Sequence, residues 1–231
     1  MSDLRIRARL LSAASLVRQG ALFADIGTDH AYLPIFLLKE GKIDHAIASD
    51  INEGPLSKAR ENVASAGLSD KVDFFLCDGA RALCDSGATD YAVCGMGGEL
   101  IADIIRSAEH LKSDGVRLIL QPMTREGHLR RFLYENGFDI LSETYSYDSG
   151  KYYVTLCSHY TGTPVSLSES EYALGREGIP RINSEAERGY LQTKQRAYER
   201  AAVGKSLGGE SGSVEREIIE LIKSRLEALH K

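Results

Sequence analysis

Short apolar strands alternate with helical segments over most of the chain, and this order restricts the fold more than any other feature. The spacing of apolar residues predicts strands at residues 21–26, 45–49, 72–76, 91–94 and 116–121. It predicts helices at residues 4–18, 34–40, 55–66, 99–110 and 125–136. Pro34 and Pro55 are expected at the first helical positions, with Gly41 and Gly67 just past the ends. Strands joined by helices are typical of a parallel sheet covered on both faces.

The alternation ends at Gly137, where two extended runs, residues 138–147 and 151–158, are separated only by the turn sequence DSG. A hairpin at this point makes the last strand antiparallel in an otherwise parallel sheet. Class I methyltransferases have this arrangement, and simple dinucleotide dehydrogenases lack it. The predicted fold class is therefore α/β, a Rossmann-like domain with a mostly parallel seven-stranded sheet that ends in an antiparallel hairpin.

A linker-like segment, TGTPVSLS at residues 161–168, separates this domain from a tail with no strand signal. Helices are expected at residues 182–203 and 214–230, joined by a flexible connection. The last helix has an apolar stripe formed by Val214, Ile218, Leu221, Ile222, Leu226 and Leu229, and the previous one a weaker stripe formed by Ile182, Ala186, Tyr190, Ala197 and Ala201. An antiparallel helical hairpin would bury both stripes; a solvated helical tail is the alternative. The expected domains are residues 1–160, which are catalytic, and residues 161–231, which are helical.

The composition excludes several classes of protein. No apolar run approaches the roughly 18 residues of a membrane span, and the N-terminus lacks the apolar core of a signal peptide. The four cysteines have no CxxC spacing, so we expect free thiols in the cytoplasm and no metal site. The net charge is −5, and residues 1–164 carry 17 basic and 22 acidic side chains. A nucleic-acid enzyme with this charge must gather its cations on one face.

The first strand ends in ADIGTDH, which places Asp25, Gly27 and Asp29 where doubly wound sheets bind nucleotides. The GxGxxG pattern that cradles a pyrophosphate is absent. S-adenosylmethionine has no phosphate and carries an ammonium and a sulfonium group, which favour acidic neighbours.

Two more acidic residues follow the next strands. Asp50 ends the second strand, at the position of a carboxylate that binds ribose hydroxyls, and Asp78 lies just past the third, where it could accept from an adenine amino group. Each residue alone is also a common helix cap or turn residue. All three carboxylates at successive strand ends favour a cationic cofactor that contains adenosine.

The fourth strand ends in CGMGGE, where three glycines leave the backbone open to a flat substrate. The alternative is a tight strand-to-helix turn with Gly98 near the helix start. Met96 and Met123 are either part of this rim or packing residues.

These motifs make the chain resemble a known family. ADIGTDHAYLP, SDINEGPLSKARENV, CGMGGELI, LILQPM, GFDILSET and GKYY are similar to the bacterial tRNA (adenine-22-N1)-methyltransferases, the TrmK family. The resemblance covers residues 4–158 and extends loosely into the tail, which that family has as a coiled-coil hairpin. It implies S-adenosyl-L-methionine as cofactor and tRNA as partner. The implied cofactor-binding residues are Asp25, Gly27, Thr28, Asp50, Ile51, Asp78 and Gly79. The implied residues around the methyl-transfer site are Asp29, His30, Gly95, Met96, Gly97 and Gly98.

The implied chemistry needs no conspicuous catalytic dyad. Adenine N1 has a lone pair, so alignment can supply most of the acceleration, and His30 either orients a substrate or is merely hydrogen-bonded in a turn. Three alternatives stay open: a small-molecule or protein methyltransferase on the same fold, a nicotinamide-dependent dehydrogenase, and a non-catalytic RNA-binding protein. The tail cations Arg188, Lys194, Arg196 and Arg200 are candidates for phosphate contacts. The sequence leaves the oligomeric state open, and a monomer is favoured.

Overall fold

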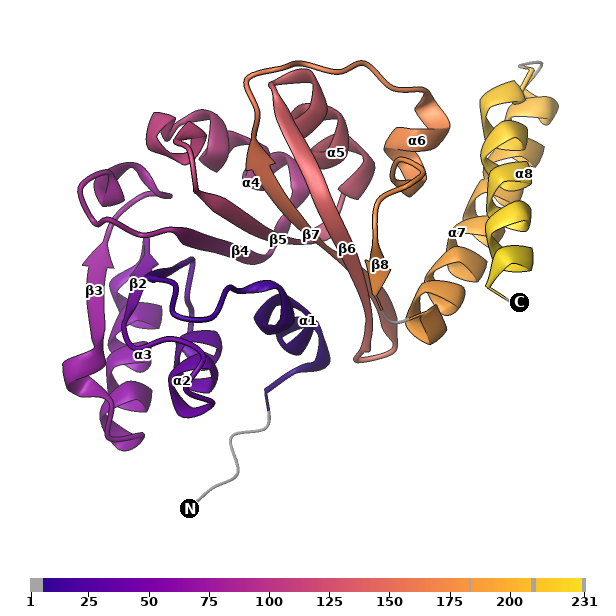
Figure 1. Cartoon of the computed structure of the whole chain (residues 1–231). Coiled ribbons are helices and arrows are strands. Elements are labelled where there is room, and N and C mark those ends of the chain that lie inside the picture. The colour runs from indigo at the N-terminus through magenta and orange to yellow at the C-terminus, as the bar shows by residue number, and fades with distance from the viewer. Residues whose placement is uncertain (1–5, 183, 209–210, 230–231) are drawn as a thin grey trace.

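The computed structural model describes residues 6–182, 184–208 and 211–229. Within them, eight strands form one sheet in the order β3-β2-β1-β4-β5-β7-β6-β8 (Figure 1). The strands are β1 Phe23–Ile26, β2 Ala46–Asp50, β3 Val72–Leu76, β4 Asp90–Gly97, β5 Arg117–Thr124, β6 Phe138–Asp148, β7 Lys151–Tyr160 and β8 Arg181–Ile182. Strands β1 to β5 are parallel, whereas β7 runs antiparallel to both β5 and β6. The predicted sheet with its antiparallel hairpin is confirmed. The sequence analysis missed β8, because two residues are too few to show a periodicity.

Helices cover both faces of the sheet. They are α1 Ala8–Leu16, α2 Tyr32–Lys39, α3 Glu53–Ser65, α4 Gly98–Arg106, α5 Glu126–Glu135, α6 Glu169–Leu174, α7 Ser184–Leu207 and α8 Ser213–Ala228. Leu4 and Arg5 of the first predicted helix and His230 of the last lie outside the described residues. None of the helices in the described part of the chain is long and apolar enough to cross a membrane.

The prediction that Pro34 and Pro55 occupy first helical positions is wrong. Helix α2 begins at Tyr32 and α3 at Glu53, so each proline is the third residue of its helix. The first N–H groups of a helix have no intrahelical partner, and a residue without an N–H is therefore tolerated throughout the first turn. The predicted ends are confirmed, since Gly41 and Gly67 follow α2 and α3 with φ of 63° and 71°.

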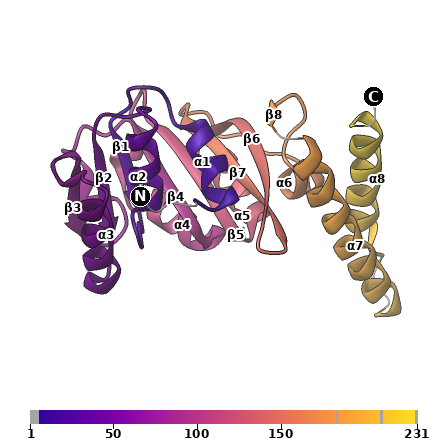
Figure 2. The same cartoon turned by 90° about the horizontal axis from the view of Figure 1, so that it is seen from below.

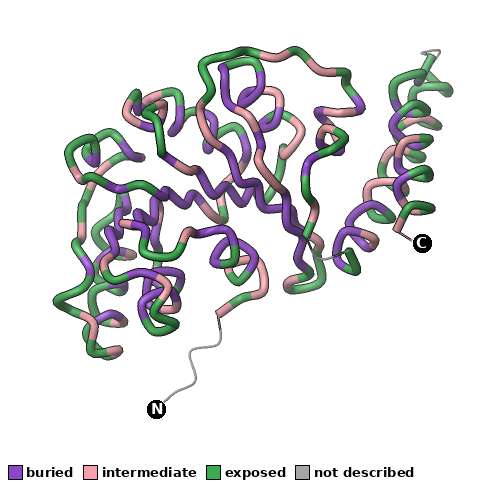
Figure 3. The backbone as a smooth tube through the Cα atoms, in the orientation of Figure 1, coloured by how far each residue is buried: buried purple, intermediate pink, exposed green. Residues whose placement is uncertain are grey.

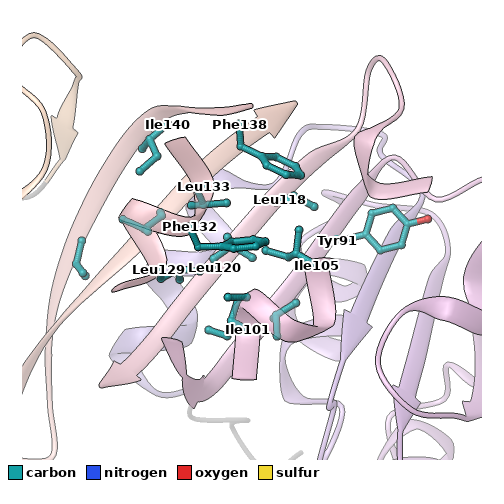
Figure 4. Close-up of a cluster of buried hydrophobic side chains, with 14 of the residues drawn as sticks. Tyr91, Ile101, Ile105, Leu118, Leu120, Leu129, Phe132, Leu133, Phe138 and Ile140 are labelled. Carbon is teal, nitrogen blue, oxygen red and sulfur yellow. The ribbon is translucent and has the colours of Figure 1, made fainter. Parts of the chain in front are cut away.

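Two apolar cores lie on opposite faces of the sheet, because side chains alternate along each strand. On β2, Ala46 and Ala48 pack toward α1, α2 and α3, whereas Ile47 packs toward α4 and α5. Figure 4 shows side chains of the second core between α4, α5 and the sheet, including Ile105, Leu120 and Phe132. The central strands are buried almost throughout (Figure 3).

The tail forms the predicted helical hairpin, with α7 and α8 side by side at the end of the molecule away from β3 (Figures 1 and 2). On the α8 stripe, Ile218 and Ile222 are buried and Val214 is exposed, and the three leucines are partly buried. The stripe predicted on the preceding helix is wrong in part. Ala186 and Tyr190 are buried, but Ala197 and Ala201 are exposed and Ile182 belongs to β8. The reason is that the second half of α7 extends past the sheet.

Buried polar contacts join the tail to the sheet. The Arg130 guanidinium on α5 donates to Glu143 Oε1 on β6 at 2.7 Å, and both side chains are fully buried. Arg130 also donates to the carbonyl of Ala173 in α6. Arg225 on α8 donates to the carbonyls of Leu174 and Gly175. Tail residues also belong to the second apolar core, so residues 1–160 and the tail share buried surface.

Candidate active site

A cavity of about 650 Å³ opens at the carboxyl ends of the parallel strands. Its walls come from the start of α1 and from the segments that follow β1, β2, β3 and β4. This is the edge at which open α/β sheets bind ligands. Among the described residues, none beyond Ile104 contributes to the lining; the helical tail follows β8, the last strand at the other end of the strand order from β3.

Asp25 and Gly27 form the floor of the cavity. The amides of Gly27 and Thr28 donate to the carbonyl of Ser49, which ties the turn after β1 to β2. Asp25 is buried and accepts a 2.7 Å hydrogen bond from Thr28 Oγ1. The pKa of the Asp25 carboxyl is raised to about 6, chiefly because the group is buried; the Thr28 hydrogen bond lowers the pKa, and the neighbouring Asp50 raises it.

Gly27 cannot be replaced without disturbing this floor. Its φ is 71°, and a Cβ built on it would lie 2.1 Å from Met96 Cε. The backbone after β1 thus lies directly against the side chain of Met96, near the end of β4. A ligand in the cavity therefore meets bare backbone at this point.

Asp50 and Asp78 lie on the side formed by β2 and β3. Asp50 is buried apart from 9% of its surface, and its Oδ1 accepts from the amide of Asn52. Asp78 is exposed and follows β3, as predicted. Gly79 has a φ of 63° and lies against Ile104. Ile51 directly follows Asp50. It is 61% exposed and adds an apolar side chain to the cavity lining. All seven candidate cofactor-binding residues line this cavity.

Asp29 and His30 form the outer part of the β1 side. Asp29 and Ala31 both have left-handed backbone, with φ of 50° and 55°. The backbone carbonyl of His30 accepts a hydrogen bond from the side-chain amide of Asn62. The centroids of the His30 and Tyr32 rings are 5.2 Å apart. His30 Nε2 lies 3.5 Å from Asp29 Oδ2. The strained turn therefore places an imidazole and a phenol ring together in the cavity wall.

The four glycine-loop candidates divide into two pairs. Gly95 and Met96 line the cavity, whereas Gly97 and Gly98 do not. Gly97 pairs with Thr124 on β5, and a Cβ on Gly98 would lie 2.5 Å from the carbonyl oxygen of Arg125. The structure thus assigns Gly98 to close packing at the start of α4, which was the alternative weighed from the sequence.

Arg9 is a cavity residue that the motifs did not identify. Its Nη1 donates to Gln121 Oε1 at 3.0 Å, and its Nε lies 3.8 Å from Asp148 Oδ2. The same Nη1 lies 3.2 Å from the position of a Cβ on Gly95. The helical pattern of residues 4–18 indicated that this segment packs on the protein but gave no sign that Arg9 reaches the ends of β4 and β5.

The charges in the cavity suit a ligand with both signs. Asp25, Asp29, Asp50 and Asp78 supply four carboxylates, and Arg7 and Arg9 supply guanidinium groups. Cys94 also lines it, and burial raises the pKa of its thiol, which therefore stays protonated. In the described part of the chain, no three His, Cys, Asp or Glu side chains are grouped to hold a metal ion. All four cysteines are free thiols, as predicted.

Comparison with known proteins agrees with this arrangement. A family model described as a methyltransferase domain matches residues 6–156, which include every residue that lines the cavity. The chain belongs to this methyltransferase family. Over 156 residues it is 35% identical to the tRNA (adenine(22)-N(1))-methyltransferase of Bacillus subtilis (strain 168). That alignment covers 68% of this chain and 66% of the relative, just under two thirds of its length.

Solved structures of methyltransferases extend the similarity into the tail. Streptococcus pneumoniae Sp1610, solved in complex with S-adenosyl-L-methionine, is 33% identical, with a TM-score of 0.79 over 93% of this chain and 100% of the other. The B. subtilis m1A22 tRNA methyltransferase TrmK is 26% identical, with a TM-score of 0.76 over 99% and 98% of the two chains. The resemblance to the TrmK family seen in the sequence is confirmed.

Proposed function

We propose that this protein is an S-adenosyl-L-methionine-dependent methyltransferase that methylates N1 of adenine 22 in tRNA. The observation that carries the proposal is the 35% identity to the B. subtilis enzyme of that name. The similarity of fold over nearly the whole chain to the m1A22 methyltransferase TrmK, tail included, supports it. Such an enzyme would act in the cytoplasm, and we propose that it acts as a monomer.

The cavity residues fit the cofactor, which supplies an electrophilic methyl group on a sulfonium when bound. Asp50 is placed to accept from two ribose hydroxyls, and the exposed Asp78 to accept from the adenine amino group. Gly27 and Gly95, which both line the cavity, would lie beside the methionine portion. Arg9, whose side chain is partly exposed, would hold its carboxylate, while the acidic floor at Asp25 suits its positive charges.

The chain's part in methyl transfer is mainly one of position. Adenine N1 carries a lone pair, so no strong base has to remove a proton first, and in-line alignment can supply most of the acceleration. N1 lies on the Watson–Crick edge, so the nucleotide must be unpaired or extruded to reach the cavity. His30 and Tyr32 lie in the cavity wall, where a flat base can contact their rings. Met96 and Gly95 border the same space.

The proposal is tested by incubating the purified protein with methyl-labelled cofactor and three acceptors: bulk tRNA, a metabolite extract and a protein extract. Label is expected in tRNA, and digestion should release it as 1-methyladenosine. Label in metabolites or proteins would favour the other methyltransferases on this fold. Binding of tRNA without any methyl transfer would favour a non-catalytic RNA-binding protein.

A further inference from the structure

Arg125 occupies an unusual position next to the cavity. It is the first residue after β5 and the N-cap of α5, and its φ of 60° and ψ of 34° are left-handed. Its side chain is 71% exposed. Sequence analysis placed Arg125 inside a helix and gave it no role.

The local structure disfavours an arginine here in two ways. A left-handed backbone is unfavourable for a residue with a Cβ, which comes too close to the following carbonyl oxygen. A cation at the N-terminus of a helix meets the positive end of the helix dipole. The only ion pair of Arg125 in the described structure is long, with 3.9 Å between its Nε and Glu99 Oε1. Exposed pairs of this kind contribute little to stability. The folded protein thus gains nothing evident from this side chain.

The other left-handed residues with side chains differ from Arg125. In the described chain they are Asp29, Ala31 and Ser149. Asp29 and Ala31 flank His30 at the cavity. Ser149 lies in the hairpin turn, and its Oγ donates to Asp148 Oδ1, as turn residues commonly do. Arg125 has no such local hydrogen bond among the described contacts, which leaves its guanidinium available to a partner.

The backbone of Arg125 is fixed relative to the cavity. Its carbonyl oxygen lies 2.5 Å from the position of a Cβ on Gly98, so the two chain segments touch. Thr124, one residue earlier, pairs with Gly97 on β4. Gly97 directly follows Met96, which lines the cavity. The exposed guanidinium of Arg125 is therefore attached to a fixed backbone position, next to the cavity wall that Gly95 and Met96 form.

We propose that Arg125 binds a phosphate of the RNA substrate beside the nucleotide that enters the cavity. The inference rests on the proposed function. A guanidinium matches phosphate in charge and geometry, and phosphate contacts hold a nucleic acid in register while other groups select the base. Residues 1–164 are net acidic, so one cation beside the cavity contributes a larger share of the attraction to RNA than it would on a basic protein.

The test compares Arg125→Gly and Arg125→Gln with Ser149→Gly in steady-state methylation of tRNA. Both Arg125 variants are expected to raise the KM for tRNA about tenfold while kcat stays within about twofold. This is the result of losing one charged contact that the bound substrate makes equally in the ground state and in the transition state. The dependence of log KM on log salt should become shallower by about one. Binding of S-adenosylhomocysteine should be unchanged in all three. Both glycine variants should unfold at higher temperature, since each relieves a left-handed residue.

Two results would overturn the inference. One is a KM and salt dependence in both Arg125 variants equal to those of the wild type. The other is a raised KM in Arg125→Gly alone. Arg125→Gln also lacks the charge but still has a side chain that restricts the backbone, so this result would point to the backbone and not to the charge. Failure of the wild-type protein to methylate tRNA would instead refute the proposed function, and it is seen before any variant is compared.

Discussion

The carboxylate of Asp50 is the residue on which the proposed cofactor position depends most. Asp50→Ala should weaken binding of S-adenosylhomocysteine by roughly 2–4 kcal/mol, because two hydroxyls lose a charged acceptor. Asp78→Asn should weaken it less, since an amide oxygen still accepts. Calorimetry measures both, and Asp73→Ala is the control, because Asp73 pairs with His45 on the surface. Unchanged affinity in Asp50→Ala would rule out the ribose contact.

Asp25 should make the stability of the free protein depend on pH. Its folded pKa of about 6 lies above its ordinary value of 3.8. The folded protein therefore binds a proton more tightly than the unfolded chain, and stability falls as pH rises from about 4 to 6 and then levels off. Asp25→Asn keeps the polar group without the charge. The free energy of unfolding of Asp25→Asn minus that of the wild type should therefore be larger at pH 7.5 than at pH 4.5. Urea unfolding at the two pH values measures this difference. An equal difference at both pH values would contradict the buried charge.

At the residue scale, the sequence predicted the acidic residues of the cavity but not its cations. Asp25, Asp50 and Asp78 follow strands, and parallel strands bring their carboxyl ends together, so local pattern is sufficient to find them. Arg9 meets Gln121 across 112 positions of sequence, and no local pattern encodes that contact. Arg125 was equally hidden, since its distinction is a backbone angle and an exposed side chain.

At the scale of elements, the tail is attached through Arg225, which donates to two carbonyls at the end of α6. Arg225→Leu removes both donors, which leaves the Gly175 carbonyl with only the 3.5 Å hydrogen bond from Arg181, and should lower the free energy of unfolding by about 2–4 kcal/mol. Affinity for S-adenosylhomocysteine should not change, because the tail does not line the cavity. Lys223→Ala on the same helix is the control, as Lys223 forms only an exposed pair with Glu220. Equal stability of the two variants would show that Arg225 does not hold the tail.

The elements themselves were largely predictable, because their apolar periodicities are local. The hairpin of β6 and β7 and the helices of the tail were found in this way. Helix α6 and strand β8 were not, since both are short; α6 depends on Arg130 and Arg225 for its position, and β8 on pairing with β6. Of the tail cations proposed for RNA, Arg196 and Arg200 are exposed, but Lys194 pairs with Glu126 and Arg188 donates to the carbonyl of Leu229. Only the first two are therefore well placed for phosphate contacts.

At the scale of the whole molecule, the helical hairpin lies at the end of the sheet away from β3 (Figure 1), whereas the cavity lies at the carboxyl ends of β1 to β4. A substrate that reaches both must be long, which a folded tRNA is and a metabolite is not. Arg125, after the central strand β5, lies on the way between them. A long substrate that contacts both regions would explain why the tail packs on the sheet without lining the cavity.

The most direct test of the account is the amount of 1-methyladenosine formed in two tRNAs that differ only at position 22. One has adenine there and the other guanine, and each is incubated with the full-length protein and S-adenosyl-L-methionine before nucleoside analysis. The account predicts close to one 1-methyladenosine per molecule of the first tRNA and none in the second. Equal methylation of both tRNAs, or of neither, would contradict it.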